Sequence, residues 1–447
     1  MDSSDTSSRI GSWRSRWAAA ILIAVGALGV RIGFLDSTGF PPDQHYFVEW
    51  AFQSQCFGMA SVYDRLSDGR SFCNYPPLYV YVLRGLAAVQ NRMTDPAAHL
   101  GPDTGLAIWS DTRDPSAPVA RVLFKLPGVI ADCALVFLLC FWLWPRAGGR
   151  LASAVAAAYA LSPAVIHDSA VWGQVDGIVT LLMLLSLESI RRRELVWMAA
   201  WAALALLMKA QAMMIAPIWA AALCVIAPRR PLELVKAAGV FVAISVVILL
   251  PFSDALDKVW EVYSRAAKYY PFVHLNGFSA WFLGYPLAAP SLKGVLSDAY
   301  VRDNTATFPG LTPRLWGMTG LLVLWGRVFL ELWRRRMDDV SLAWATKVLP
   351  LGFFVLSTQM HERYLFPAIA LWAWAAVPKW RWWIRWSLLS LGALVNQWWV
   401  WPGHPDGAFA VMMKKYLHHE WVGMSVSGVL IAILVATILE KRPRQQV

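Results

Sequence analysis

The sequence predicts an all-α polytopic membrane protein with about twelve transmembrane helices and interfacial helices in a long first loop. Hydrophobic residues make up 57% of the 447 positions and charged residues only 15%, whereas soluble domains are about 45–50% apolar and about 25% charged. Apolar runs recur along the whole length and are separated by short arginine-rich turns. This is the pattern of helices that cross a bilayer core of about 30 Å, so we expect a single membrane domain over residues 1–447.

The apolar runs define the candidate spans in chain order. The first run follows Arg9, Arg14 and Arg16, as in a signal peptide, but no small-residue cleavage site closes it. We therefore expect it to be retained as the first span. The expected spans are 17–35, 119–144, 151–166, 171–190, 195–208, 213–226, 234–250, 311–333, 343–356, 364–377, 384–401 and 421–439.

Run 76–89 is ambiguous, because its length of about 14 residues is short for a crossing and it contains Arg84. If it is an interfacial amphipathic helix, every basic turn falls on the side of the N terminus, in agreement with the positive-inside rule. If it crossed, all these turns would fall outside. The basic turns are Arg146/Arg150, 191–193, Arg229/Arg230, 334–336, 379–385 and 441–444.

This charge pattern predicts that loops 36–118 and 254–312 lie on the outer, periplasmic face of a plasma membrane. Aromatic residues in 254–312 favour a further interfacial helix or lid over disorder. Cys56 and Cys73 lie in the first of these loops, where they form either a disulfide or two unpaired thiols. The net charge of +11 resides in turns and not on an aromatic-basic surface, so we expect no nucleic-acid partner.

Polar residues of the types that serve in catalysis and substrate binding collect in the turns of the predicted periplasmic side. Taken singly, each has an ordinary explanation, such as capping a helix, snorkelling from a helix end or belonging to an aromatic belt. Taken together, they indicate a cavity, because ionisable groups at membrane ends are costly and tend to face one. The groups are Asp43; His167 and Asp168 with Trp172, Gly173, Gln174 and Asp176; Lys209 with Gln211; and His361, Glu362 and Arg363.

The mixture of one acid with several cations favours a phosphorylated substrate. Lys209, His361 and Arg363 suit a phosphate, and Asp43 is a candidate base. A sugar on a lipid phosphate is already activated, because the phosphate leaves as a stable anion that neighbouring cations stabilise. One base then suffices, unlike the carboxylate pair of glycoside hydrolases.

Six stretches of the chain resemble glycosyltransferases of the GT-C fold that use polyprenyl-phosphate sugars. The likeness is to the α-1,3-glucosyltransferases of the N-glycan pathway and to bacterial proteins similar to the second mannosyltransferase of GPI-anchor synthesis. The stretches are DQHYFVEWA (43–51), NYPPLYVY (74–81), HDSAVWGQVDG (167–177), KAQAMMIAP (209–217), YYPFVHLNGFSAW (269–281) and MHERYLFP (360–367). The family has lysine where this chain has Arg363, and the WGQVD stretch also departs from the family's.

The resemblance implies that Asp43 deprotonates the acceptor, that His361 and Arg363 hold the donor phosphate, and that Lys209 assists them. It also implies a single displacement that inverts the anomeric carbon, with no cofactor. Some relatives hold a divalent metal with several acids, for which Asp43, Asp168 and Asp176 are the candidates here, but we expect no metal, because three acids and a group of phosphate-binding cations would compete at one centre. The partners implied are membrane lipids, a polyprenyl-phosphate sugar donor and a glycan or lipid-linked acceptor. The residues expected to bind substrate are Tyr75, Trp172, Gln174, Asp176, Gln211, Asn276 and Glu362.

The function expected from the sequence is transfer of one hexose, mannose or glucose, from a polyprenyl phosphate to a periplasmic, lipid-linked glycan. Two alternatives remain open. One is a GT-C transferase that acts on protein or on a cell-wall polymer, and the other is a transporter or flippase. Transporters bind their substrates near the bilayer midplane, whereas the polar groups here are expected at one rim.

Overall fold

The computed structural model describes residues 3–64, 72–93, 118–265, 271–283, 302–304, 310–376, 379–403 and 406–440. Within these ranges the chain is helical and forms only isolated β-bridges. Parts of both predicted periplasmic loops, namely 65–71 and 94–117 in the first and 266–270, 284–301 and 305–309 in the second, lie outside the described residues, as does the basic turn 441–444.

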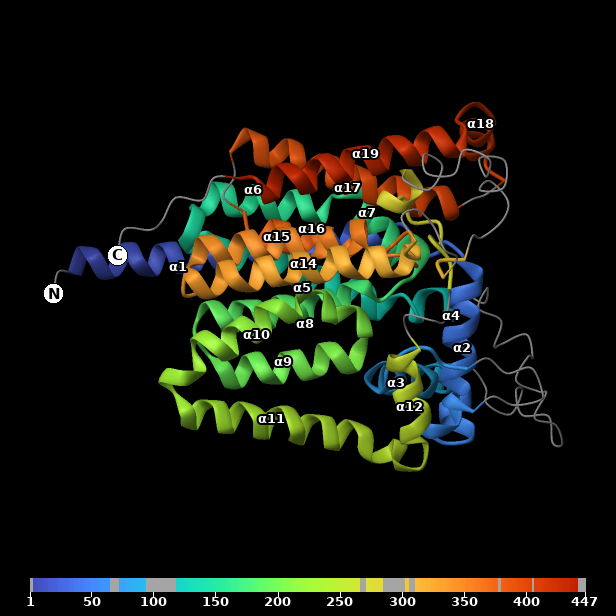
Figure 1. Ribbon diagram of the computed structural model, residues 1–447, viewed down its shortest axis with the longest axis horizontal. Coiled ribbons are helices and arrows are strands. Elements are labelled where there is room, and N and C mark those ends of the chain that lie inside the picture. The colour runs from blue at the N-terminus through green and yellow to red at the C-terminus, as the bar shows by residue number, and fades with distance from the viewer. Residues whose placement is uncertain are drawn as a thin grey trace.

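Long apolar helices form a bundle in which sequence neighbours pack against one another (Figure 1). The bundle helices are α1 (Ser3–Ile32), α5 (Leu126–Ala147), α6 (Gly149–Ala160), α8 (Asp176–Arg191), α9 (Leu195–Met208), α10 (Ala216–Val225), α11 (Pro231–Leu249), α14 (Pro313–Arg334), α15 (Asp339–Leu356), α16 (Phe366–Trp374), α17 (Trp380–Val400) and α19 (His419–Ile438).

The remaining elements connect or cover these helices. They are α2 (Pro41–Cys56), η1 (Met59–Tyr63), α3 (Pro77–Met93), α4 (Pro118–Leu123), α7 (Pro163–Ile166), the π-helical turn η4 (His167–Trp172), η5 (Ala210–Ile215), η6 (Ala227–Arg229), η7 (Leu250–Ala255), α12 (Leu256–Ser264) and α18 (Ala408–Tyr416).

The all-α class predicted from the sequence is confirmed for the described residues, and each expected span coincides with at least one helix. Six helices are long and apolar enough to cross a membrane, or up to seven if the bent pair Gly149–Ala160 and Pro163–Trp172 is one span. The α9 helix and the η5–α10 segment are apolar but shorter. The chain is thus typical of a membrane-embedded protein, while the number of twelve spans stays a prediction.

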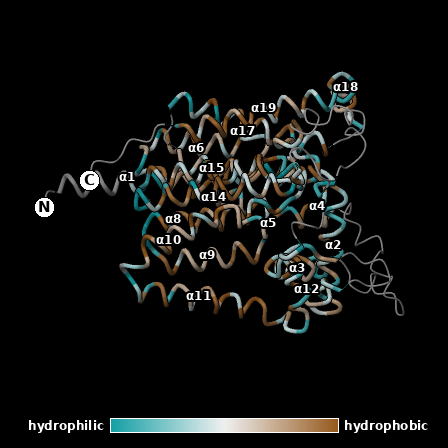
Figure 2. Tube along the Cα trace, viewed as in Figure 1, coloured by the Kyte–Doolittle hydropathy of each residue, from teal (hydrophilic) through white to brown (hydrophobic). Residues whose placement is uncertain are grey.

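The ambiguous run 76–89 forms α3, which lies with α2 and α12 across one end of the bundle instead of along it (Figure 1). This arrangement agrees with the expected interfacial helices in both loops. Hydrophobic residues dominate the length of α9 and α11, and hydrophilic residues collect at the turns (Figure 2). The three transverse helices therefore cover the end at which α1 finishes and α2 begins.

Basic turns gather at the opposite end of the bundle. Arg193 donates hydrogen bonds to the carbonyl oxygens of Arg336, at 3.0 Å, and of Met337, at 2.9 Å. Arg230 donates to the carbonyl oxygen of Arg193 at 3.3 Å. The prediction that these three turns share one end is confirmed, and their cytoplasmic location remains an expectation from the positive-inside rule.

A fully buried ion pair ties the first helix into the bundle. Arg31 Nε lies 3.1 Å from Asp132 Oδ2, and both side chains are 0% exposed. Arg31 Nη1 also donates to the carbonyl oxygens of Ala27 and Ala160, and Ser169 donates to Asp132. Because each charge has several partners, the pair holds α1, α5, α6 and η4 together.

Cys56 and Cys73 are both free thiols. Cys56 is exposed at the end of α2, whereas Cys73 is buried and directs its sulfur at the carbonyl oxygen of Tyr75, 3.7 Å away. Of the two alternatives that the sequence left open, the structure therefore has unpaired thiols and no disulfide.

Candidate functional site

Asp43 lies in the first turn of α2, at the end of the bundle covered by the transverse helices. Its Oδ2 atom accepts hydrogen bonds from Trp172 Nε1, at 2.7 Å, and from Gln174 Nε2, at 2.5 Å. Within the described part of the chain, no hydrogen bond reaches Oδ1, and the side chain is 16% exposed. One carboxylate oxygen is thus fixed and the other remains available to a substrate.

The turn that carries Trp172 and Gln174 is held against the start of α2 by backbone contacts. Gln44 Nε2 donates to the carbonyl oxygen of Gly173 at 3.0 Å, and the Phe40 amide donates to that of Trp172 at 2.9 Å. Gly173 has φ of 87°, and a Cβ there would lie 2.4 Å from Gln44 Nε2. Only glycine fits this position without strain.

Arg363 lies at the centre of the cluster. Its Nη1 atom is 2.7 Å from Glu362 Oε1 and 3.4 Å from Asp43 Oδ2, and its Nε atom is 3.8 Å from Asp176 Oδ2. Burial alone would lower the pKa of Arg363, but the neighbouring carboxylates outweigh it and raise the pKa, so the guanidinium stays charged. The guanidinium also lies 5.6 Å from the ring centroid of Trp172, within cation–π range.

Lys209 joins the cluster from the break between α9 and η5. Its ammonium group forms an ion pair with Asp176, the first residue of α8. The Tyr75 ring centroid lies 5.4 Å from Lys209 Nζ, and the Tyr75 hydroxyl donates to Gln174 Oε1 at 3.2 Å. Burial raises the pKa of Tyr75 well above its usual range, so this hydroxyl remains a donor.

His361 lies at the edge of the cluster, with a side chain that is 19% exposed. Its Nδ1 atom is 3.8 Å from Glu362 Oε2. Burial would raise the pKa of Glu362, but the contact with His361 and the charge of Arg363 outweigh it and lower the pKa. Glu362 is therefore an ionised partner for the Arg363 guanidinium and a neighbour of the His361 ring.

The structure thus brings together eight of the residues predicted for substrate or phosphate binding around Asp43, from four separate parts of the chain. They are Tyr75, Trp172, Gln174, Asp176, Lys209, His361, Glu362 and Arg363. Their roles as base, phosphate ligands and substrate ligands stay predictions.

Two predicted residues adjoin the cluster in a different way. Asn276 bridges to His361 through its backbone, which has φ of 64°. Gln211 donates from Nε2 to the carbonyl oxygen of Tyr364 at 3.2 Å, and its Oε1 atom is buried with no hydrogen-bond partner among the described residues. Neither side chain contacts the central ion pairs in the described residues.

The cations of the site are already paired with carboxylates. The expected phosphate site is therefore not a group of unpaired cations. Arg363 contacts Asp43, Asp176 and Glu362, and Lys209 contacts Asp176. The facing atoms Arg363 Nε and Asp176 Oδ2 are both buried and have no hydrogen bond to any residue that the structure describes. A phosphate would therefore share Arg363 with these acids and would not meet an unpaired group of cations.

Asp303 is a further polar residue near this site that the sequence did not single out. It is fully buried and accepts hydrogen bonds from Arg314 at 3.0 and 2.6 Å, from Thr358 at 2.9 Å and from Gln359 at 2.7 Å. These bonds fix the backbone that leads into the His361 loop. Gln44 was also missed, although it stands next to Asp43 in the quoted stretch.

The described residues contain no group of three or more His, Cys, Asp and Glu side chains arranged to hold a metal ion. The carboxylates of Asp43, Asp176 and Glu362 instead converge on Arg363.

Acidification is expected to destabilise the segment that supports His361. Burial, reinforced by His419, lowers the pKa of His274 from 6.5 to about 4, so the unfolded chain binds this proton more readily than the folded chain. The stability contributed by neutral His274 is present above pH 6.5 and is lost as the pH falls toward about 4. Thermal unfolding in detergent between pH 7.5 and 4.5 measures this loss.

His274→Gln should flatten that pH dependence, whereas His418→Gln, a change at an exposed position, should leave it unchanged. Identical pH dependence in the wild type and His274→Gln would contradict the assignment.

A scan against protein-family models finds no match to this chain, and a search of curated proteins finds none either.

Proposed function

We propose that the protein is an inverting glycosyltransferase that moves one hexose from a polyprenyl phosphate to a periplasmic, lipid-linked glycan. The observation that carries the proposal is the setting of Asp43. One of its oxygens is fixed by Trp172 and Gln174, the other is open, and Arg363 lies 3.4 Å away. A single available carboxylate beside a permanent cation suits displacement of a phosphate leaving group.

The reaction proposed is a single displacement. Asp43 Oδ1 takes the proton of the acceptor hydroxyl as the hydroxyl oxygen bonds to the anomeric carbon. The bond between that carbon and the phosphate oxygen breaks, and the polyprenyl phosphate leaves with the electron pair. Attack from the opposite face converts a β-linked donor into an α-linked product, and Arg363 and His361 stabilise the departing charge.

The position of the cluster favours transfer over transport. Its residues lie where α2 begins, where α8 begins and where α9 ends, at one end of the bundle. The buried ion pair of Arg31 with Asp132 is bonded to the carbonyl oxygens of Ala27 and Ala160 and to the Ser169 hydroxyl. It fits a structural contact better than an ion pathway through the membrane.

The direct test is to incubate the purified protein with a panel of radiolabelled polyprenyl-phosphate hexoses and lipid-linked glycans, and to identify the product and its anomeric configuration. We expect an α-linked product with mannose or glucose, formed about 10²–10⁴-fold more slowly by the Asp43→Asn protein. Transfer to protein or to a cell-wall polymer would support the alternative acceptors. Donor translocation in proteoliposomes without any product would support a flippase.

His361→Ala is expected to weaken use of the donor. Loss of one hydrogen bond to a charged group costs about 1.5–3 kcal/mol, which corresponds to about a tenfold to 100-fold rise in the donor KM. The acceptor KM should change little. Donor and acceptor titrations measure both values, with His418→Ala at an exposed position as the matched control. An unchanged donor KM would remove His361 from the phosphate site.

A further inference from the structure

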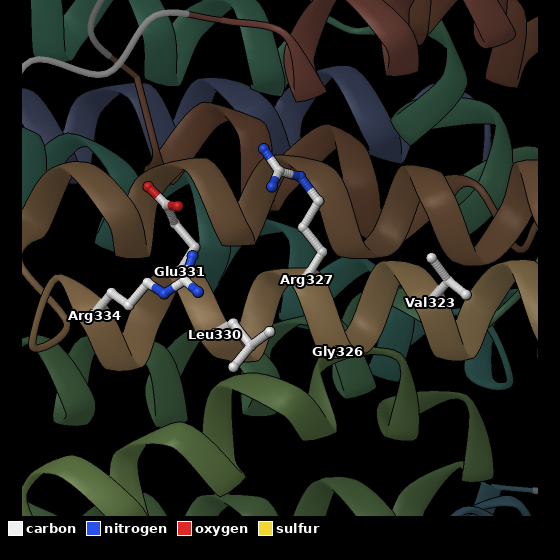
Figure 3. Close-up of a pocket in the computed structure, with 6 residues that line it drawn as sticks. All are labelled: Val323, Gly326, Arg327, Leu330, Glu331 and Arg334. Atoms are coloured by element: carbon white, nitrogen blue, oxygen red, sulfur yellow. The ribbon is translucent and has the colours of Figure 1, made fainter.

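A shallow hollow of about 360 Å³ lies on α14, far along the chain from Asp43. Six residues of this one helix line it (Figure 3): Val323, Gly326, Arg327, Leu330, Glu331 and Arg334. Because α14 is apolar and long enough to cross a membrane, its exposed face meets lipid. We propose that this hollow binds the headgroup of an anionic phospholipid through Arg327 and Arg334.

Arg327 lies well inside the apolar helix α14. It lies seven residues before Arg334, the last residue of α14, and thus about 10 Å along the helix axis. An arginine this far inside a span is costly when it faces lipid. Long arginine side chains extend toward the headgroup level, where a lipid phosphate would supply the missing anion.

The carboxylates near Arg327 and Arg334 leave both arginines available to an anionic ligand. Within the described residues, neither Arg327 nor Arg334 forms an ion pair with a carboxylate. Glu331 stands between them in sequence, but its Oε1 atom lies 3.9 Å from Arg335 Nη1. Arg335 pairs with Asp338 as well. The hollow therefore holds two cations that are paired with no carboxylate of the described residues, while the Glu331 carboxylate in its lining lies near Arg335.

The exposed face of α14 has room for a ligand beside an apolar surface. A Cβ built on Gly326 would meet no atom within 4 Å, so the backbone is open to a ligand at this point. Toward the other end of the helix, the face continues with exposed apolar side chains: Leu315, Met318, Leu322 and Val323. A phosphate at the arginines and acyl chains along this face match a phospholipid better than a soluble anion.

The location of the hollow also suits an anionic headgroup. Arg334 adjoins the turn in which Arg336 accepts a hydrogen bond from Arg193, so the hollow lies toward the basic end of the bundle. Basic pockets on the cytoplasmic side of membrane proteins attract anionic headgroups. Asp43 and Arg363 lie at the other end, so this site is separate from the proposed donor site and does not depend on the proposed function.

Native mass spectrometry of the full-length protein in micelles with equal phosphatidylglycerol and phosphatidylcholine tests the proposal. The wild type should retain phosphatidylglycerol preferentially. Arg327→Gln and Arg334→Gln should each weaken its retention about fivefold, and the double variant about 25-fold, from the attraction of each basic residue to anionic lipid. Gly326→Leu should also weaken retention by filling the hollow, whereas Arg327→Lys should largely preserve it.

Lys236→Gln is the matched control, because Lys236 is an exposed cation near the start of the apolar helix α11 but is paired with Glu233 at 3.1 Å. Equal retention of phosphatidylglycerol by the control and the double arginine variant would overturn the proposal. Equal retention of the two lipids by the wild type would do the same. If the arginine substitutions abolished an oligomer but left lipid retention unchanged, the hollow would bind a second copy of the chain and not a lipid. That result would also overturn the proposal.

Discussion

Asp43→Asn is expected to lower the rate of sugar transfer by about 10²–10⁴-fold, the usual range for loss of a general base. Asparagine has the same shape and keeps an oxygen that can accept the bonds from Trp172 Nε1 and Gln174 Nε2. The end that faces the acceptor then carries an amide, which cannot take a proton. The fold should therefore persist while the chemistry is lost.

Single-turnover assays with the donor saturating measure this rate, and thermal unfolding in detergent reports the fold. Asp64→Asn is a matched control, since Asp64 is a carboxylate paired with Lys258 at 2.5 Å near the same end of the bundle. Near-normal turnover of Asp43→Asn would remove Asp43 from the mechanism. A loss of activity as large in Asp64→Asn would point to a structural effect of changing acids at this end.

Arg363→Gln is expected to reduce both activity and stability. The guanidinium is buried and contacts three carboxylates, those of Asp43, Asp176 and Glu362. Removing one partner of a buried ion pair costs about 3–5 kcal/mol, because the remaining charge is left uncompensated. Loss of a charge that stabilises the transition state lowers the rate by about 10²–10³-fold.

Arg363→Lys separates these two effects. Lysine keeps the charge but not the planar group that contacts several carboxylates at once, so stability should recover more fully than activity. Thermal unfolding and donor-saturated rates of both variants measure the difference. If Arg363→Gln remained as active as the wild type, the proposed stabilisation of the leaving group by Arg363 would be wrong.

The sequence predicted the helices well, because apolar runs near the width of a bilayer are determined by local composition. Positions such as 234–250 and 343–356 reappear in α11 and α15 with shifts of a few residues at their ends. The helix ends depend on caps and kinks that hydropathy does not encode. The Asp338 side chain, for example, accepts from the Ser341 amide and starts α15 four residues before the predicted boundary.

The candidate site was predictable only as a set of residues at one end of the bundle. Alternation of spans places Asp43, Lys209 and Arg363 on the same side, and the structure adds that they meet through shared carboxylates. Which cation pairs with which acid depends on distances of a few ångströms between distant segments, which no local pattern contains. Asp303 was missed for the same reason, since its partners lie up to 56 residues away.

The pairing of Arg31 with Asp132 has a consequence for how the protein is made. The two residues are 101 positions apart, and chains grow at about 5–20 residues per second, so the arginine is synthesised about 5–20 s before its aspartate. During that interval the first helix carries a charge that the bilayer interior disfavours. In nascent chains that stop before position 132, this helix should therefore be poorly anchored. It reaches its final position only when α5, which contains Asp132, has been synthesised.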